Sequence, residues 1–292
     1  MSGNWTVIEL LRWAVPYLEK YGVSTPRLDA ELLLARALSC ERLDLYLNYD
    51  RPTSAAEREA FKTLLIRRRE REPIAYILGQ REFWSLPLLV NPDVLVPRPE
   101  TEHLVEAAVA VISRHYAAGG TVVDLGTGSG NILLALAHHF QDHAGLNWLG
   151  FDISPEAVET AGQNARRLQL EQVEFAVADL AEVRPRPGEN WDVILCNPPY
   201  IPTVELKDLP AEVQREPRGA LDGGADGLDY YRLLSRRISL LLPAGGFLLV
   251  EVGAGQAEQV KALFAKQHPQ TLETVVDLQG IERVVIGQWI PS

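Results

Sequence analysis

The sequence predicts an α/β protein with a Rossmann-like, mostly parallel sheet that ends in an antiparallel C-terminal hairpin. From Thr121 onward, apolar strand-like runs alternate with helix-like stretches, which is typical of a parallel sheet covered by helices on both faces. Before about position 80, apolar residues instead recur at helical spacing. We therefore expect a small helical-bundle domain at 1–80, a β-hairpin linker at 81–97 and the α/β domain at 98–292.

Helices are expected throughout the first part. The first covers 5–21, and Thr25-Pro26 provides a cap and a first-turn proline for a second helix that ends near Leu38. The capping box Ser54-Ala55-Ala56-Glu57 opens another, which ends in the basic run 67–71. We interpret this run as a solvated helix end favoured by the helix dipole, with a docking patch for an anionic partner as the alternative.

The linker is predicted to be a hairpin with one strand at Phe83–Val90, a turn at Asn91-Pro92-Asp93 and a second strand at Val94–Val96. A helix from Pro99 or a neighbour to about Tyr116 follows it. Beyond that point we expect parallel strands at 122–125, 148–153, 173–178, 191–196 and 247–252. Helices are expected at 132–140, 155–170, 228–242 and up to about 267, and the C-terminal hairpin at 271–277 and 283–288.

Charge is unevenly distributed along the 292 residues, whose formal net charge is −11. Through position 80 there are 12 Lys and Arg against 11 Asp and Glu, and from position 81 onward 16 against 28. An acidic surface repels phosphate backbones, so we expect no stable nucleic-acid partner. The scattered histidines and the two distant cysteines, Cys40 and Cys196, predict neither a disulfide framework nor a metal site. Without a membrane-length apolar run or a signal peptide, we expect a cytoplasmic monomer that does not contact membranes.

A glycine-rich turn, Asp124-Leu125-Gly126-Thr127-Gly128-Ser129-Gly130, follows the first strand of the α/β region. The glycines allow a tight turn and a close approach of the backbone to a ligand. The spacing differs from the G-x-G-x-x-G of dinucleotide-binding folds, and Asp124 would oppose a pyrophosphate. That carboxylate suits a ligand with an amino group or a sulfonium cation.

The next two strands end in acidic residues that suit a nucleoside. Asp152 can bind both hydroxyls of a ribose, and Asp179 with Leu180 can hold an adenine amine and its ring face. Each feature alone is often only a turn or a helix cap. In order, at the ends of consecutive strands, they predict S-adenosylmethionine as the cofactor.

The tetrapeptide Asn197-Pro198-Pro199-Tyr200 directly follows a buried strand. The two prolines prevent both helix and further strand pairing, so the backbone leaves the sheet in an extended path. The Asn197 side-chain oxygen and the Pro198 carbonyl can accept both hydrogens of a planar NH₂ group, while the Tyr200 ring walls the pocket. The tetrapeptide alone could be an ordinary proline turn; with the upstream motifs it predicts a grip for an amide or an exocyclic amine.

Together these motifs resemble class I S-adenosylmethionine-dependent methyltransferases that act on a planar nitrogen. The closer resemblance is to the bacterial PrmC/HemK family, the peptide chain release factor N(5)-glutamine methyltransferases, and it covers essentially the whole chain. It also rests on Arg81-Glu82-Phe83-Trp84, Pro97-Arg98-Pro99-Glu100-Thr101-Glu102, Glu216-Pro217, Ala220-Leu221 and Glu282-Arg283.

The resemblance implies a protein-glutamine N-methyltransferase whose substrate is the glutamine of the Gly-Gly-Gln motif in class I bacterial release factors. The helical domain would dock this substrate, and S-adenosyl-L-homocysteine would be the second product. The implied catalytic residues are Asn197, Pro198, Pro199 and Tyr200. The implied cofactor-binding residues are Asp124, Gly126, Thr127, Gly128, Ser129, Gly130, Asp152, Asp179, Leu180 and Asn197.

Two positions and several functions remain open at this stage. Leu180 stands where some family members have a larger aromatic side chain, and Arg98 could either pin the linker or line the substrate entrance. A nucleic-acid adenine or guanine N-methyltransferase shares the tetrapeptide but calls for a basic recognition region. A ribosomal-protein glutamine methyltransferase and a non-catalytic cofactor-binding scaffold are also compatible with parts of the pattern, and a nicotinamide oxidoreductase is disfavoured by the glycine spacing.

Overall fold

The computed structural model describes residues 5–289. It divides into two compact units. The helical unit consists of Met1–Gln80 together with Pro210–Arg215, and the sheet unit consists of Arg81–Leu209 and Glu216–Ser292. The short segment Pro210–Arg215 thus belongs to the helical unit, although the chain on either side of it belongs to the sheet unit.

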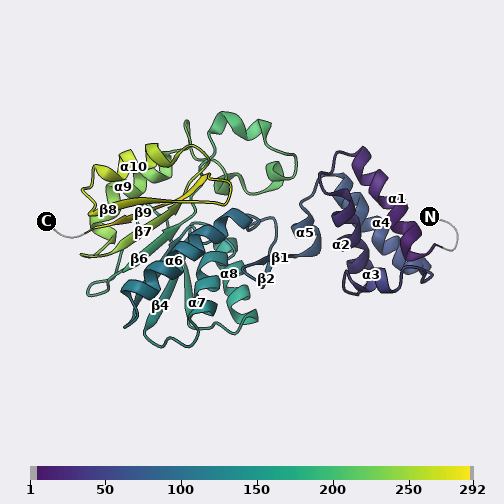
Figure 1. Ribbon diagram of the computed structural model, residues 1–292, viewed down its shortest axis with the longest axis horizontal. Helices are drawn as coiled ribbons and strands as arrows, with labels where there is room; N and C mark the ends of the chain where they lie inside the picture. The colour runs from purple at the N-terminus through teal and green to yellow at the C-terminus, as the bar shows by residue number, and fades with distance from the viewer. Residues whose placement is uncertain (1–4, 290–292) are drawn as a thin grey trace. The chain divides into compact units, whose positions relative to one another are not determined.

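The helical unit contains α1 (Val7–Lys20), α2 (Pro26–Leu38), α3 (Asp44–Leu47), α4 (Ala55–Arg69) and α5 (Ile74–Leu78) (Figure 1). The three longer helices confirm the predicted ones, and the capping box at Ser54 and Glu57 is formed as expected. The short α3 and α5 were not predicted. Their apolar residues Leu45 and Ile77 join the same buried core as those of the longer helices, such as Leu10 and Phe61.

The basic run at 67–71 is not simply a solvated helix end, because Arg68 is buried. Its guanidinium donates to Asp29 of α2 at 2.6 Å and to Glu212 of the short segment at 2.8 Å. Arg71 also donates to Glu212, at 2.6 Å, and Arg67 pairs with Glu72. Most arginines of this run therefore form ion pairs within the helical unit. The sequence did not indicate these pairs, because their partners lie outside α4.

The linker hairpin is present, but the predicted turn is wrong. Its strands are β1 (Gln80–Phe83) and β2 (Leu86–Leu89), and the chain reverses at Trp84 and Ser85, with φ of 51° and 60°. Residues with positive φ at both turn positions are typical of the tight turn that matches the twist of two paired strands. The predicted second strand, Val94–Val96, does not form, because the amide of Val96 donates to the Glu216 carboxylate instead of to a neighbouring strand.

The sheet unit contains a seven-stranded sheet in the order β5-β4-β3-β6-β7-β9-β8. Its first five strands along the chain are parallel, and β9 runs antiparallel to both β7 and β8, as the predicted C-terminal hairpin requires. The strand bounds are β3 (Gly120–Leu125), β4 (Leu146–Asp152), β5 (Val173–Val177), β6 (Val193–Cys196), β7 (Phe247–Glu251), β8 (Thr271–Val276) and β9 (Glu282–Gln288).

Helices cover both faces of this sheet (Figure 1). The helices α6 (Glu102–His115), α7 (Asn131–His139) and α8 (Pro155–Arg167) share one core with strand residues such as Val122 and Val193. The helices α9 (Asp229–Leu241) and α10 (Ala257–Ala265) share the other core with strand residues such as Val123 and Ile194. Strand side chains alternate between the two faces, so consecutive apolar residues fill both cores.

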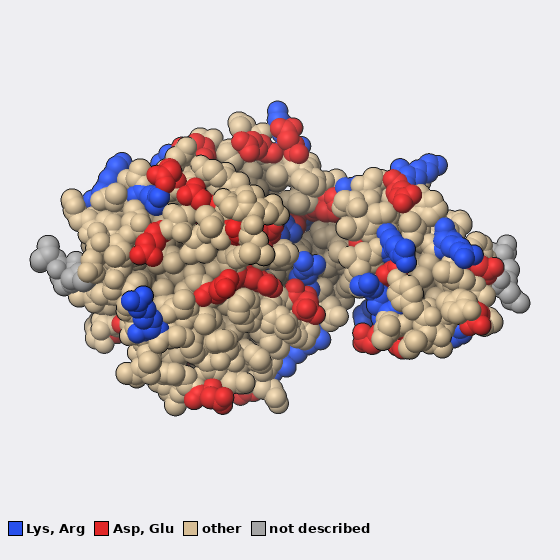
Figure 2. Space-filling view, in the orientation of Figure 1, with Lys and Arg blue, Asp and Glu red and all other residues tan. Residues whose placement is uncertain are grey.

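Short 3₁₀ turns complete the sheet unit's connections. They are η1 (Pro99–Thr101), η2 (Thr203–Asp208) and η4 (Arg218–Ala220), while η3 (Val213–Arg215) lies in the segment assigned to the helical unit. Within residues 5–289, no helix is both long enough and apolar enough to cross a membrane. On the face of the sheet unit that Figure 2 shows, Asp and Glu lie in several separate groups, and Lys and Arg do not form a continuous patch.

Candidate active site

The sheet order and register bring the predicted site residues to one edge. Leu125 of β3 pairs with Phe151 of β4 on one side and with Cys196 of β6 on the other. The next residues along these strands, Gly126, Asp152 and Asn197, therefore start at the same level, at the carboxyl ends of the strands. The chain order changes direction between β3 and β6, and ligands of open α/β sheets bind at such a switch point.

The glycine turn is shaped by backbone hydrogen bonds and by left-handed residues. The amides of Gly126 and Thr127 donate to the Phe151 carbonyl at 2.8 and 2.9 Å, and all three glycines have positive φ. A Cβ on Gly126 or Gly128 would meet no atom within 4 Å, so the turn borders open space there. A Cβ on Gly130 would instead lie 3.0–3.2 Å from the side chains of Leu134, Phe175 and Ala161, so this glycine serves packing.

Asp124 is fully buried at the start of the turn. The Thr127 hydroxyl donates to its Oδ2 at 2.7 Å, whereas its Oδ1 is buried and finds no hydrogen-bond partner among the described residues. Burial raises the pKa of this carboxyl to about 7, and the nearby Asp152 charge acts in the same direction. The Ser129 hydroxyl is likewise buried without a partner among the described residues. A cationic amino group brought to this place would satisfy the free acceptor of Asp124.

Asp152 is bound by two backbone amides, that of Gly128 to Oδ2 at 2.8 Å and that of Ser154 to Oδ1 at 3.0 Å. Each carboxylate oxygen keeps a further lone pair, so this oriented carboxylate can still accept from two ribose hydroxyls. Asp179 is exposed, and its Oδ1 accepts from the Ala181 amide at 2.7 Å. Leu180 packs against the core on the side of α9. The acceptors, the open glycine turn and the free carboxylate oxygen fit S-adenosylmethionine.

The tetrapeptide leaves β6 as the sequence predicts. Asn197 is half-buried, and its Nδ2 donates to the Thr101 hydroxyl at 3.2 Å. The Tyr200 carbonyl accepts from the Gln256 side-chain amide at 3.0 Å. Burial raises the pKa of the Tyr200 hydroxyl to about 12, so the ring stays neutral at physiological pH.

A glycine-rich loop packs tightly against the backbone of the tetrapeptide. A Cβ on Gly223 would lie 2.8 Å from the Pro199 carbonyl oxygen, and one on Gly227 would lie 2.3 Å from that of Tyr200. The amide of Ile201 also donates to the Leu221 carbonyl at 3.0 Å. Only glycine permits so close an approach, and the loop fixes the path of the tetrapeptide.

Two side chains next to Asn197 were not predicted from the sequence. Thr101, in η1, is buried, and its hydroxyl accepts from the Asn197 amide. The same hydroxyl interacts with the carboxyl of Glu251 and lowers its pKa. Cys196 pairs with Val250, so Glu251, the next residue of β7, lies at the level of Asn197 on the neighbouring strand. Burial raises the pKa of Glu251 to about 7. The only available signal was the Pro-Arg-Pro-Glu-Thr-Glu segment that contains Thr101.

Arg98 of the same segment has a defined partner. Its guanidinium donates to Oε1 of Glu216 at 2.5 Å, and the other oxygen of that buried carboxylate accepts from the Val96 amide at 3.0 Å. Arg98 therefore ties the end of the linker to the chain that follows the tetrapeptide. Of the two roles left open by the sequence, this contact corresponds to pinning the linker.

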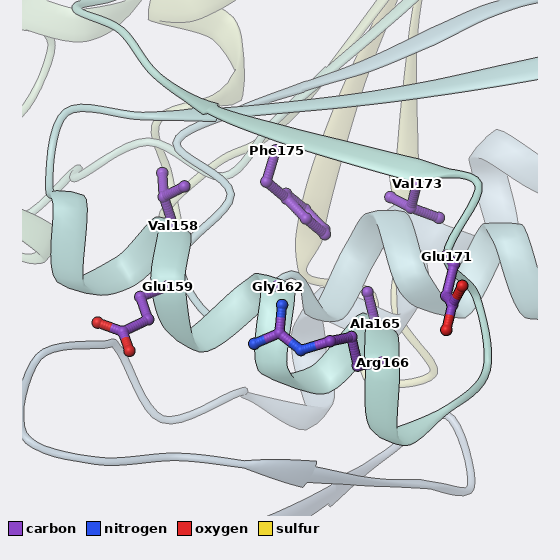
Figure 3. A pocket seen from close by; sticks show the side chains of 8 residues that line it. All are labelled: Val158, Glu159, Gly162, Ala165, Arg166, Glu171, Val173 and Phe175. Atoms are coloured by element: carbon purple, nitrogen blue, oxygen red, sulfur yellow. The ribbon is translucent and has the colours of Figure 1, made fainter.

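The sheet unit also has a hollow away from these residues. It has a volume of about 560 Å³ and lies between α8 and the edge strand β5 (Figure 3). None of the predicted site residues lines it. Its wall consists of Val158, Glu159, Gly162, Ala165, Arg166, Glu171, Val173 and Phe175.

Comparisons with known proteins relate both parts of the chain to described families. Residues 9–79 match the family model described as PrmC N-terminal domain, and residues 117–281 match one described as Methyltransferase domain. The chain is 42% identical to a release factor glutamine methyltransferase of Geobacter sulfurreducens, with 97% of each chain covered. It is 44% identical to a protein of the same name from Rhodospirillum rubrum, covering 93% of this chain and 81% of the other.

Solved structures show the same fold at lower identity. The catalytic domain of hMettl16, in complex with MAT2A 3′UTR hairpin 6, matches with a TM-score of 0.56 at 13% identity, covering 75% of this chain and 82% of that one. At this identity the likeness concerns the fold alone. The fold is that of class I S-adenosylmethionine-dependent methyltransferases, as the sequence predicts.

Proposed function

Since the chain belongs to the release factor glutamine methyltransferase family and is a protein-glutamine methyltransferase, we propose that it methylates the glutamine of the Gly-Gly-Gln motif in class I bacterial release factors. The transferred methyl group would go to the side-chain amide nitrogen of that glutamine. The observation that carries the proposal is the position of Asn197 and Pro198, at the switch point of the sheet and level with the glycine turn.

We assign the cofactor site to the three strand ends. Asp124 would take the amino group, the backbone of Gly126 to Gly130 would border the methionine part, Asp152 would bind the ribose hydroxyls, and Asp179 with Leu180 would hold the adenine. When bound, S-adenosylmethionine supplies an electrophilic methyl group and leaves as S-adenosyl-L-homocysteine. The individual residues are assigned here from their free acceptors and from the open space beside the turn.

An amide nitrogen is a poor nucleophile, because its lone pair is delocalised into the carbonyl. In the proposed mechanism, the Asn197 side-chain oxygen and the Pro198 carbonyl accept the two N–H bonds of the substrate glutamine and aim its nitrogen. The same acceptors stabilise positive charge that develops on this nitrogen. Orientation of this kind supplies roughly 7–11 kcal/mol in well-held pairs. Tyr200 walls the pocket with its ring, and Pro199 keeps the backbone extended.

No side chain is required as a dedicated base before transfer. The N–H bonds become more acidic as positive charge develops on nitrogen, and the methylated amide then loses a proton to solvent. This distinguishes the amide from a serine or cysteine nucleophile, which needs a base first.

The proposal also covers the domains and the partners of the protein. The helical domain at 1–80 docks the release factor, the linker lies at 81–97, and the catalytic domain lies at 98–292. The protein works as a cytoplasmic monomer without stable nucleic-acid or membrane partners.

The test is a transfer assay with purified protein and methyl-labelled S-adenosylmethionine. The acceptors are a class I release factor, the same factor with its Gly-Gly-Gln glutamine replaced by alanine, a ribosomal-protein fraction, and DNA. Label on the intact release factor only is the expected result. Undiminished label on the substituted factor, or label on DNA or on a ribosomal protein in place of the release factor, would contradict the proposal.

A further inference from the structure

Three polar side chains form a chain that runs from the tetrapeptide into the core of the sheet unit. The Asn197 Nδ2 donates to the Thr101 hydroxyl at 3.2 Å. That hydroxyl interacts with the Glu251 carboxyl and lowers its pKa, against the larger effect of burial. Thr101 and Glu251 are 1% and 2% exposed, so neither side chain faces bulk solvent. The second oxygen of Glu251, Oε2, has no partner among the described residues.

The chemistry of the chain gives it a direction. Above pH 7, where Glu251 is mostly ionised, its carboxylate has acceptors only, so the proton of the Thr101 hydroxyl points to Glu251. The hydroxyl oxygen then has only lone pairs left for Asn197. Those lone pairs can be met by the amino end of the Asn197 amide but not by its oxygen, so the two ends of this amide are no longer equivalent.

We propose that Thr101 and Glu251 are positioning residues, which hold the Asn197 amide with its amino end toward the core and its oxygen toward the substrate. Neither touches the reacting atoms. The inference rests on the proposed function, because it concerns the acceptor that would grip the glutamine NH₂ group. If the amide were reversed, Asn197 would present donors to a group that also consists of donors.

Reversal or loose rotation of Asn197 should act on turnover and not on cofactor binding. The cofactor acceptors Asp124 and Asp152 lie on other strands and make none of their hydrogen bonds to Thr101 or Glu251. A release factor would be held by many contacts, so its KM depends little on one acceptor. The rate of transfer depends on a correctly aimed nitrogen.

The experiment compares Thr101→Val with Thr101→Ser and with a matched control, Thr160→Val. Thr160, on α8, is also a buried threonine whose hydroxyl accepts from an asparagine amide, that of Asn91 at 3.1 Å, but it lies outside the proposed site. The assays use the full chain at pH 8, above the pKa of Glu251. They measure kcat, the KM for the release factor, calorimetric binding of S-adenosyl-L-homocysteine, and the melting temperature.

We expect Thr101→Val to lower kcat by about tenfold or more, with KM and cofactor affinity within about threefold of the parent, since the lost hydrogen bond orients the acceptor of the substrate amide. Thr101→Ser keeps the hydroxyl and should recover kcat to within about threefold. Thr160→Val should lose a comparable amount of melting temperature but almost no kcat.

Two outcomes would overturn the inference. One is a Thr101→Val enzyme with the kcat of the parent, and the other is a Thr101→Ser enzyme as slow as Thr101→Val although both are folded. Asn197→Ala, assayed alongside, separates this from failure of the proposed function. If Asn197→Ala is inactive while Thr101→Val is fully active, only the positioning role is wrong; if Asn197→Ala is itself fully active, the proposed grip is wrong.

Discussion

At the scale of single residues, Asp124 has the most constrained environment of the proposed cofactor site. Its carboxyl is fully buried, one oxygen has no partner among residues 5–289, and burial raises its pKa from 3.8 to about 7. The folded protein therefore holds a proton that the unfolded chain releases between about pH 4 and pH 7. The stabilisation from this proton is fully present below the unfolded pKa and is lost as the pH rises through the folded one.

Asp124→Asn should therefore stabilise the protein more at pH 8 than at pH 5, because the substitution removes a buried charge that is present mainly at the higher pH. We expect the melting temperature to rise by a few degrees at pH 8, with a smaller rise at pH 5. Thermal denaturation followed by circular dichroism at both values measures this. Glu251, whose pKa is also raised, is unchanged in the comparison. An equal gain at both pH values would contradict the account.

The same substitution should weaken cofactor binding, because an amide cannot pair with an amino group as a carboxylate does. Calorimetry with S-adenosyl-L-homocysteine should give an affinity at least about tenfold lower for Asp124→Asn at pH 8. Improved stability together with poorer binding is the expected pattern for a charge retained for a ligand. Binding equal to that of the parent would show that Asp124 has no direct role.

Asn197 and Tyr200 are expected to respond differently to substitution. Asn197→Ala removes an acceptor for the substrate amide, so kcat should fall by about a hundredfold or more while cofactor affinity is largely kept. Tyr200→Phe should change kcat by less than about threefold, because the ring and not the hydroxyl forms the wall. Single-turnover assays paired with calorimetry test both. Loss of cofactor binding in Asn197→Ala, with normal turnover of the remaining complex, would refute the assigned role.

At the scale of secondary-structure elements, the end of α4 shows how burial separates two adjacent arginines. Arg68 is buried against Asp29, which is itself 1% exposed, whereas Arg67 is partly exposed and pairs with Glu72. Removing one partner of a buried pair leaves an uncompensated charge, and this costs about 3–5 kcal/mol. Removing one partner of an exposed pair typically costs about 1 kcal/mol or less.

Arg68→Ala should consequently loosen the helical unit far more than Arg67→Ala does. Hydrogen exchange of amides in α2 and α4 measures the local opening free energy, and we expect a reduction of about 3 kcal/mol for Arg68→Ala. The adjacent variant serves as the matched control for loss of an arginine from the same helix. Equal effects of the two variants would mean that the buried ion pair does not contribute as described.

Many elements of both units were predictable from sequence, because local pattern specifies these strands and helices. The run Val193–Cys196 is apolar throughout because both faces of β6 are covered, and the capping box at Ser54 marks the start of α4 in the same way. The hairpin turn was not predictable from local pattern. Trp84 and Ser85 adopt positive φ without being glycine or asparagine, whereas Asn91-Pro92-Asp93 has the composition of a hairpin turn and forms only a local one.

The site was predictable where residues follow the ends of strands, since all parallel strands end at one edge. Asp124, Asp152 and Asn197 were predicted in this way, and the structure places them at or next to the carboxyl ends of β3, β4 and β6. Thr101 and Glu251 were not, because a hydrogen bond between residues so far apart in sequence has no local pattern. Only the register of β6 with β7, and the position of η1 beside them, brings these side chains together.

At the scale of the whole molecule, the balance of charge differs between the parts of the chain. The first 80 residues carry a formal net charge of +1 and the remainder one of −12, which together give the −11 of the chain. Each unit has its own buried core, so each has the means to fold cooperatively. Figure 2 shows the acidic groups of the sheet unit dispersed among uncharged residues on the visible face.

The short segment Pro210–Arg215 limits how this protein can be recombined with its relatives. A chimera that exchanges only residues 1–80 would bring in a foreign α4 while keeping the native Glu212, and would leave the pairing of that carboxylate with Arg68 and Arg71 to chance. A crossover that also carries positions 210–215 would keep donor and acceptor from one parent. The part of the chain that must be exchanged as a whole is therefore discontinuous in sequence. It consists of the N-terminal helices plus six residues far downstream.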